Sequence, residues 1–186
     1  MVDKILSWRV LLSFLVIYLT NASERQYRSV IQHTGKRGLA WASVVSKDMA
    51  LFNTSSLISW DYNWSPNKVD PMNVSGLQFT PMIWNGVDID KLAAKVYEQQ
   101  ATIVLAFNEP DLASQANMDP TTAAKLWIQY LEPLRAHGIK LGSPAVTQGG
   151  AWWLRAFFQA CNGSCTVDFI CAVSEFSFEL DIDVYM

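Results

Sequence analysis

Short apolar segments alternate with amphipathic segments along most of this chain, and this alternation constrains the fold more than any other feature. Apolar segments of strand length occur at 38–43, 57–60, 78–84, 103–107, 140–146 and 167–171. Amphipathic patterns with the helical period lie between some of them, at 90–100, 119–137 and 152–160. Alternating strands and helices are typical of a parallel sheet covered by helices.

Two parallel architectures fit this order, a doubly wound sheet and a (β/α)8 barrel. A nucleotide-binding doubly wound sheet normally has a glycine-rich loop after its first strand, and none follows 38–43. The barrel is therefore favoured. Because eight β/α units typically need about 250 residues and the chain has 186, we predict an α/β fold, an incomplete (β/α)8 TIM barrel with about six of its eight units.

The segment 119–137 carries the clearest helix signals. Asp119 is a favourable N-cap, Pro120 suits the first helical position, and Gly138 is a typical helix terminator. Pro133 is expected to kink the last turn, because it lacks an N–H group. The residues predicted on the buried face are Ala123, Ala124, Trp127, Tyr130, Leu131 and Leu134.

The first 22 residues have the pattern of a secretory signal peptide. Lys4 and Arg9 precede the apolar run 10–19, and small residues follow up to Ala22. A membrane anchor is the alternative, but a span needs about 20 apolar residues. We predict a signal peptide at 1–22, a polar lead-in at 23–36, a partial barrel at 37–171 and a divergent tail at 172–186, with no stable membrane insertion after signal cleavage.

Export would place the chain outside the cell or in a cell wall, and it changes how several polar residues are interpreted. Glycosylation sequons begin at Asn53, Asn63, Asn73 and Asn162. Cys161 and Cys165 flank a tight polar loop, and pairing is plausible in an oxidising compartment. A metal site is the alternative for closely spaced cysteines, but the two histidines are distant in sequence. Cys171 lies in an apolar run and is expected to be a small buried side chain.

The charge balance argues against nucleic acid as a partner. The chain has 14 Lys and Arg against 17 Asp and Glu, a net charge of −3, whereas binding to phosphates favours a basic surface. Aromatic side chains gather instead near the carboxyl ends of the predicted strands, where flat rings could stack on sugars. They are Trp41, Trp60, Tyr62, Trp64, Trp84 and Phe107.

The sequence Asn108-Glu109-Pro110-Asp111 follows the fourth predicted strand. In a barrel this end of the strands carries the catalytic residues. A carboxylic acid at the edge of an apolar strand is partly desolvated, which suits a general acid. Glu109 could therefore be one of the two carboxylates of a glycosidase, with Asn108 holding a sugar hydroxyl. The simpler interpretation is a polar turn in which Asp111 caps the next segment.

Six sequence blocks in order resemble one known family. They are Gly38-Leu-Ala-Trp41, Trp60-Asp-Tyr-Asn-Trp64, Phe79-Thr-Pro-Met-Ile-Trp84, Leu105-Ala-Phe-Asn-Glu-Pro-Asp111, Ser114-Gln-Ala-Asn-Met118 and Lys140-Leu-Gly-Ser-Pro-Ala-Val-Thr147. Residues 36–171 thereby resemble the glycosyl hydrolase catalytic-core family of the alkali-sensitive linkage protein type, glycoside hydrolase family 128.

This resemblance implies a (β/α)8 barrel that cleaves β-1,3-glucan with retention of configuration, without cofactor or metal. Glu109 would be the acid/base, and Asn108 would bind beside the scissile bond. The other blocks that line the implied glucan groove contribute Trp41, Tyr62, Asn63 and Trp84.

The sequence departs from the family after residue 171. Family members continue with two further β/α units and a second catalytic glutamate on the seventh strand, whereas 172–186 matches none of this. Glu175 and Glu179 follow the sixth strand and are interpreted as ordinary tail residues. We therefore expect a truncated chain with little activity of its own. The alternative function is a non-catalytic secreted glucan-binding or cell-wall-associated protein.

Overall fold

The computed structural model describes residues 35–41, 57–73 and 75–171. All of them belong to the second of the two units into which the chain divides, 33–186. The predicted signal peptide, most of the lead-in, the sequon at Asn53 and the tail with Glu175 and Glu179 lie outside the described residues.

The described strands are parallel. β1 (Arg37–Ala40) pairs with β2 (Ile58–Tyr62), and β2 pairs with β3 (Gln78–Phe79). β4 (Ile103–Val104) pairs with β5 (Lys140–Leu141). Within each of these two groups, every β-strand lies beside the next one along the chain, as is usual for consecutive strands.

Single bridges connect these two groups of strands. Met82 pairs with Leu105, and the Leu105 N–H donates to the Pro81 carbonyl at 2.9 Å. At the far edge of β5, Gly142 pairs with Phe169. The six predicted strands therefore all take part in parallel pairing, and the α/β class is confirmed. A closed barrel stays a prediction.

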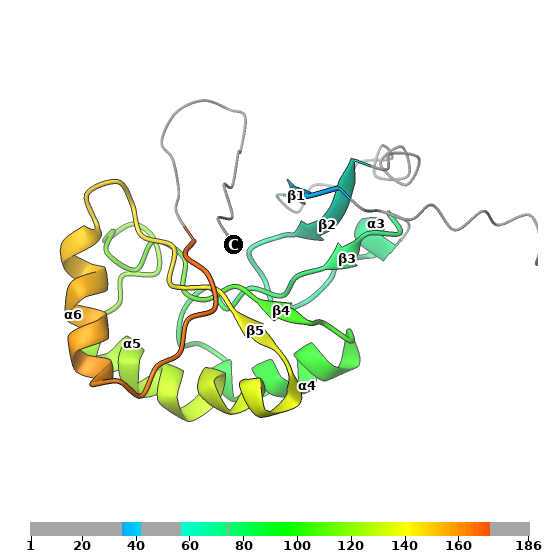
Figure 1. Ribbon diagram of the computed structural model, residues 1–186. Helices are drawn as coiled ribbons and strands as arrows, with labels where there is room; N and C mark the ends of the chain where they lie inside the picture. Colours follow the sequence, from blue (N-terminus) through cyan, green and yellow to red (C-terminus); the bar gives the residue numbers. More distant parts are fainter. Residues whose placement is uncertain (1–34, 42–56, 74, 172–186) are drawn as a thin grey trace, which may run out of the picture. The chain divides into compact units, whose positions relative to one another are not determined.

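Helices follow most of the strands (Figure 1). The α-helices are α3 (Asp70–Asn73), α4 (Leu92–Glu98), α5 (Pro120–Leu126) and α6 (Ala151–Cys161). A 3-10 turn, η1 (Ile89–Lys91), leads into α4. The short α3 has no counterpart among the predicted helices, because four residues are too few for a periodic pattern.

The segment predicted as one helix from residue 119 has three parts. α5 is followed by a π-helical turn, η2 (Trp127–Leu131), and a 3-10 helix, η3 (Glu132–His137). Asp119 caps α5 by accepting from the Thr122 N–H at 2.9 Å, and Gly138 ends η3 in the left-handed conformation. Pro133 accounts for the change of helix type, because it has no N–H with which to continue the α-helical pattern.

The two faces of the strands pack into different clusters. On one face Val104 and Leu141 pack against α4, α5, η2 and α6, including Trp127 and Phe157. The other face carries a smaller cluster of Tyr62, Met82, Leu105, Ala145, Phe169 and Cys171. This separation is the two-layer packing expected of parallel strands covered by helices.

At the end of α6, Cys161 and Cys165 form a disulfide, with 5.4 Å between their Cα atoms. Cys171 is a buried free thiol, and burial raises its pKa to about 12. Across the described ranges no helix is long and apolar enough to cross a bilayer.

Candidate active site

The residues that follow β4 are tied to neighbouring segments on both sides. The Asn108 N–H donates to the Trp84 carbonyl at 3.0 Å, and Asn108 pairs with Ala145 in a parallel bridge. The Glu109 N–H then donates to the Ala145 carbonyl at 2.7 Å. Trp84, Asn108 with Glu109, and Ala145 thus meet at the carboxyl ends of three adjacent segments.

Glu109 is half-buried and has an unusual backbone. Its φ is 41°, in the left-handed region that residues with a side chain seldom adopt. Strained backbones of this kind persist where surrounding contacts hold them, and they concentrate at functional sites.

Asn108 lies beneath the loop that follows Glu109. It is 5% exposed, and its Nδ2 donates to Gln115 Oε1 at 3.2 Å. The Asn108 carbonyl accepts from the Ala116 N–H at 3.2 Å. The loop 112–118 therefore folds over Asn108 and fixes the orientation of its amide.

Tyr62 lies in the cluster that faces away from the helices. It is 3% exposed, and its ring centre is 4.8 Å from that of Trp64 and 5.9 Å from that of Trp60. Burial, and to a lesser extent the neighbouring Cys171, raises the pKa of its phenol well above the usual value. Tyr62 is thus a neutral packed ring here.

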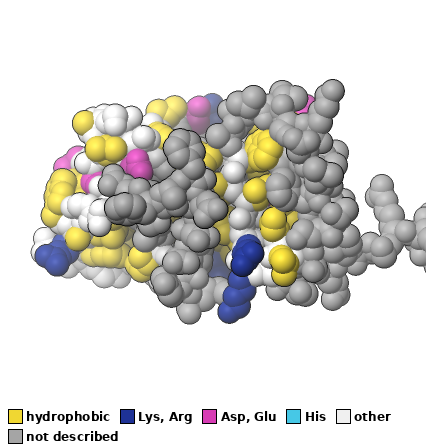
Figure 2. Space-filling model, turned by 90° about the horizontal axis from the view of Figure 1, so that it is seen from above, with side chains coloured by type: hydrophobic (Ala, Val, Ile, Leu, Met, Phe, Trp, Pro, Cys, Tyr) yellow, Lys and Arg dark blue, Asp and Glu magenta, His cyan; other side chains and the backbone are white. Residues whose placement is uncertain are grey.

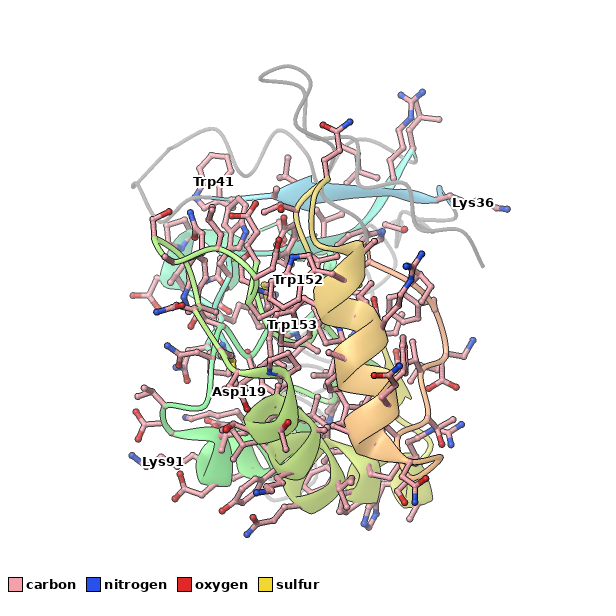
Figure 3. All side chains as sticks on the ribbon, turned by 90° about the vertical axis from the view of Figure 1, so that its left-hand side faces the viewer. Lys36, Trp41, Lys91, Asp119, Trp152 and Trp153 are labelled. Atoms are coloured by element: carbon pink, nitrogen blue, oxygen red, sulfur yellow. A yellow bond between two sulfur atoms is a disulfide. The ribbon has the colours of Figure 1, made fainter. Side chains whose placement is uncertain are left out.

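Trp41 packs in a different cluster, and Asn63 is bonded within its own loop. Trp41 stands at the opposite end of β1 from Lys36 (Figure 3), and its ring packs beside Met72 and Phe79. Asn63 is 8% exposed, and its Nδ2 donates to the Asn67 carbonyl at 2.9 Å. In the described part of the chain, Trp41 Nε1 and Asn63 Oδ1 are buried without a hydrogen-bond partner.

Asp61, which precedes Tyr62 on β2, is fully buried. Its Oδ2 accepts from the Ser75 hydroxyl at 2.9 Å, whereas Oδ1 has no partner among the described residues. Burial raises the pKa of this carboxyl to about 6, although the Ser75 bond acts in the opposite direction.

The hydrogen bonds that secure the turn after Glu109 are not predicted from the sequence, which indicates Asp111 only as a cap of the next segment. Asp111 accepts two hydrogen bonds from Thr147, one from the backbone N–H at 3.1 Å and one from the hydroxyl at 2.5 Å. Thr147 lies 36 residues away. The only signals available beforehand were the acidic residue after Pro110 and the glycine pair at Gly149 and Gly150.

Figure 2 shows hydrophobic side chains (yellow) beside Lys and Arg (dark blue) and Asp and Glu (magenta) among the coloured atoms of one face. Within the described ranges there is no group of three His, Cys, Asp or Glu residues that could hold a metal ion.

The sequence of residues 38–174 matches the family described as the glycosyl hydrolase catalytic core. The chain belongs to this family. Alkali-sensitive linkage protein 1 of Schizosaccharomyces pombe is 38% identical to this chain over an alignment of 143 residues. The match covers 74% of the chain and 26% of that protein.

Solved structures of glycoside hydrolase family 128 resemble this catalytic-core chain. A curdlan-specific exo-β-1,3-glucanase from Blastomyces gilchristii, solved with glucose, is 33% identical with a TM-score of 0.63, and the match covers 76% of this chain and 61% of the enzyme. An endo-β-1,3-glucanase from Amycolatopsis mediterranei, solved with laminaritriose, is 35% identical with a TM-score of 0.59, covering 74% of this chain and 56% of the enzyme. Variants of that enzyme with either of two glutamates replaced have also been solved with laminari-oligosaccharides. This chain thus spans about a quarter of its curated relative and less than two thirds of either enzyme.

Proposed function

We propose that this chain acts on β-1,3-glucan and that Glu109 is the acid/base of a retaining glycosidase. The position of Glu109 carries this proposal. It is half-buried at the carboxyl end of β4, its N–H is bonded to Ala145, and it follows an almost fully buried Asn108. A glycosidase needs one carboxyl that protonates the leaving group, and the end of a barrel strand is where such a residue is expected.

Family membership supports the substrate class. The related enzymes are β-1,3-glucanases, one of them solved with laminaritriose. Trp84 is a half-buried aromatic residue whose backbone carbonyl accepts from the Asn108 N–H, one residue before Glu109. Aromatic rings and amides suit an uncharged sugar chain, because the rings contact C–H groups while the amides bond hydroxyls.

A retaining mechanism also needs a nucleophilic carboxylate about 5–5.5 Å from the acid/base. Asp111 is bonded to Thr147 through both oxygens, and Asp61 is bonded to Ser75. We do not propose either of these two carboxyl groups as the nucleophile. We therefore propose that the chain binds glucan and hydrolyses it slowly or not at all by itself.

The test is turnover of laminarin by the purified full chain, with Glu109→Gln as the matched control. We expect no turnover above that of the variant. Turnover that Glu109→Gln abolishes would overturn the proposed inactivity and support the acid/base role.

A second experiment separates an enzyme without its nucleophile from a purely glucan-binding protein. Azide can attack the anomeric carbon of an aryl β-laminaribioside, so that a C–N bond forms while the bond to the aryl oxygen breaks. With a poor leaving group, protonation of that oxygen by Glu109 is required. We expect azide to produce the α-glycosyl azide with the unaltered chain and not with Glu109→Gln. Binding of laminarin without any azide product would favour the non-catalytic alternative.

We also propose that the chain is exported. The signal-like segment at 1–22 and the Cys161–Cys165 disulfide both support this location, because disulfides persist in oxidising compartments.

A further inference from the structure

One carboxylate joins the turn that carries Glu109 to the turn that follows β5. Asp111 lies two residues after Glu109, and Thr147 lies at the start of the turn that leads into α6. Asp111 Oδ1 accepts from the Thr147 N–H at 3.1 Å, and Oδ2 accepts from the Thr147 hydroxyl at 2.5 Å. Hydrogen bonds to an ionised carboxylate are about twice as strong as neutral ones.

The turn that this carboxylate holds is the one with the strained backbone. The Glu109 carbonyl accepts from the Leu112 N–H at 3.0 Å, which closes a turn around Pro110 and Asp111. Glu109 itself has a φ of 41°. A residue in this region returns to a more common conformation unless its neighbours prevent it.

Gly150 leaves the space that Asp111 occupies. A Cβ atom added at Gly150 would lie 2.5 Å from Asp111 Oδ2 and 2.6 Å from Val146 Cβ. The Gly150 N–H donates to the Thr147 carbonyl at 2.8 Å, so the glycine belongs to the same turn as Thr147. The close approach of the two turns therefore depends on a residue without a side chain at position 150.

We propose that Asp111 is a positioning residue for Glu109. By bonding Thr147 it holds the turn 109–112 against the loop after β5, and so fixes the direction in which Glu109 presents its carboxyl. The inference rests on the proposed role of Glu109. Because both oxygens of Asp111 are engaged by Thr147, its task is to hold the turn, and proton transfer is left to Glu109.

Amide hydrogen exchange measured by NMR on the full chain tests this proposal without any substrate. Thr147→Val removes the hydroxyl donor and keeps the backbone N–H, whereas Thr147→Ser keeps both donors. We expect the Glu109 amide to exchange about tenfold faster in the valine variant, as loss of one charge-assisted hydrogen bond predicts. The serine variant should restore slow exchange.

The Leu105 amide, bonded to the Pro81 carbonyl, is the internal control. It should exchange at an unchanged rate in both variants. Equal acceleration of the Leu105 and Glu109 amides would mean general destabilisation and would overturn the proposal, as would an unchanged Glu109 rate. Failure of the proposed function is a separate result, because it would appear as absence of glucan binding by the unaltered chain.

Discussion

The backbone N–H of Trp41 donates to the backbone carbonyl of Tyr62 at 2.8 Å, yet the two rings pack in different clusters. Tyr62 lies with Met82 and Leu105, on the side away from the helices. Trp41 lies beside Met72 and Phe79. The rings of these two bonded residues therefore pack in different surroundings, and the aromatic residues at the strand ends have different roles.

The first prediction concerns which tryptophan contributes to glucan affinity. Trp84→Ala should weaken binding of laminarihexaose about tenfold or more, because it removes a half-buried indole from the residue whose carbonyl accepts from the Asn108 N–H. Trp41→Phe should change the affinity less than about twofold, because its ring packs against Met72 and Phe79. Titration calorimetry on the folded variants measures both. A larger loss for Trp41→Phe than for Trp84→Ala would contradict the assignment.

The second prediction concerns the pH dependence of stability caused by Asp61. Its pKa is raised from 3.8 to about 6 in the folded chain, so the folded state binds this proton more tightly than the unfolded state. The stabilisation is fully present below about pH 4 and is lost as the pH rises through about 6. Asp61→Asn removes this titration and should be more stable than the unaltered chain at pH 7, by about 1–3 kcal/mol.

Denaturant unfolding between pH 4 and pH 8 measures this difference. It should shrink toward low pH, where the carboxyl of the unaltered chain is protonated. Comparing the two proteins at each pH cancels the opposite contribution of Glu132 and Asp168, whose pKa values are lowered. A difference that stays constant with pH would contradict the assignment to Asp61.

The third prediction concerns glycans on the exported chain. Asn162 is exposed at the end of α6, and Ser164 of the same sequon is exposed as well. Asn63 is 8% exposed, and the Nδ2 that a glycan would occupy donates to the Asn67 carbonyl. We expect the protein secreted from a eukaryotic host to carry a glycan at Asn162 and none at Asn63.

Peptide mass spectrometry after enzymatic deglycosylation identifies the occupied sites. Asn162→Gln should remove one glycan mass, and Asn63→Gln should leave the glycan mass unchanged. A folded, secreted product with a glycan on Asn63 would be incompatible with the packing of that residue.

The strand segments and the position of Glu109 after one of them could be predicted because both depend on local sequence. Apolar segments mark strands, and the Asp119 cap, Pro120 and Gly138 mark the limits of one helical segment. The turn after β4 could likewise be located from Asn108 to Asp111.

Features that depend on contacts between distant residues could not be predicted. The ring of Trp41 packs beside Met72, which no periodicity in 38–43 reveals. The bond between Asp111 and Thr147 joins residues 36 positions apart, and the strained φ of Glu109 accompanies it. The π-helical turn at 127–131 likewise precedes Pro133 in a segment whose pattern predicts one continuous helix.

The fourth prediction concerns the space that Gly150 leaves for Asp111. Gly150→Ala should lower the free energy of unfolding by about 1–3 kcal/mol, because the new Cβ would lie within 3.0 Å of Asp111 and of Val146. Gly149→Ala is the matched control: its Cβ would meet nothing within 4 Å, so it should change stability by less than about 0.5 kcal/mol. In an Asp111→Ala background the cost of Gly150→Ala should fall by about 1 kcal/mol, because one of the two close contacts is gone. Denaturant unfolding of the four proteins in this double-mutant cycle measures the coupling. Strictly additive changes in the free energy of unfolding would mean that the cost of Gly150→Ala comes only from the contact with Val146.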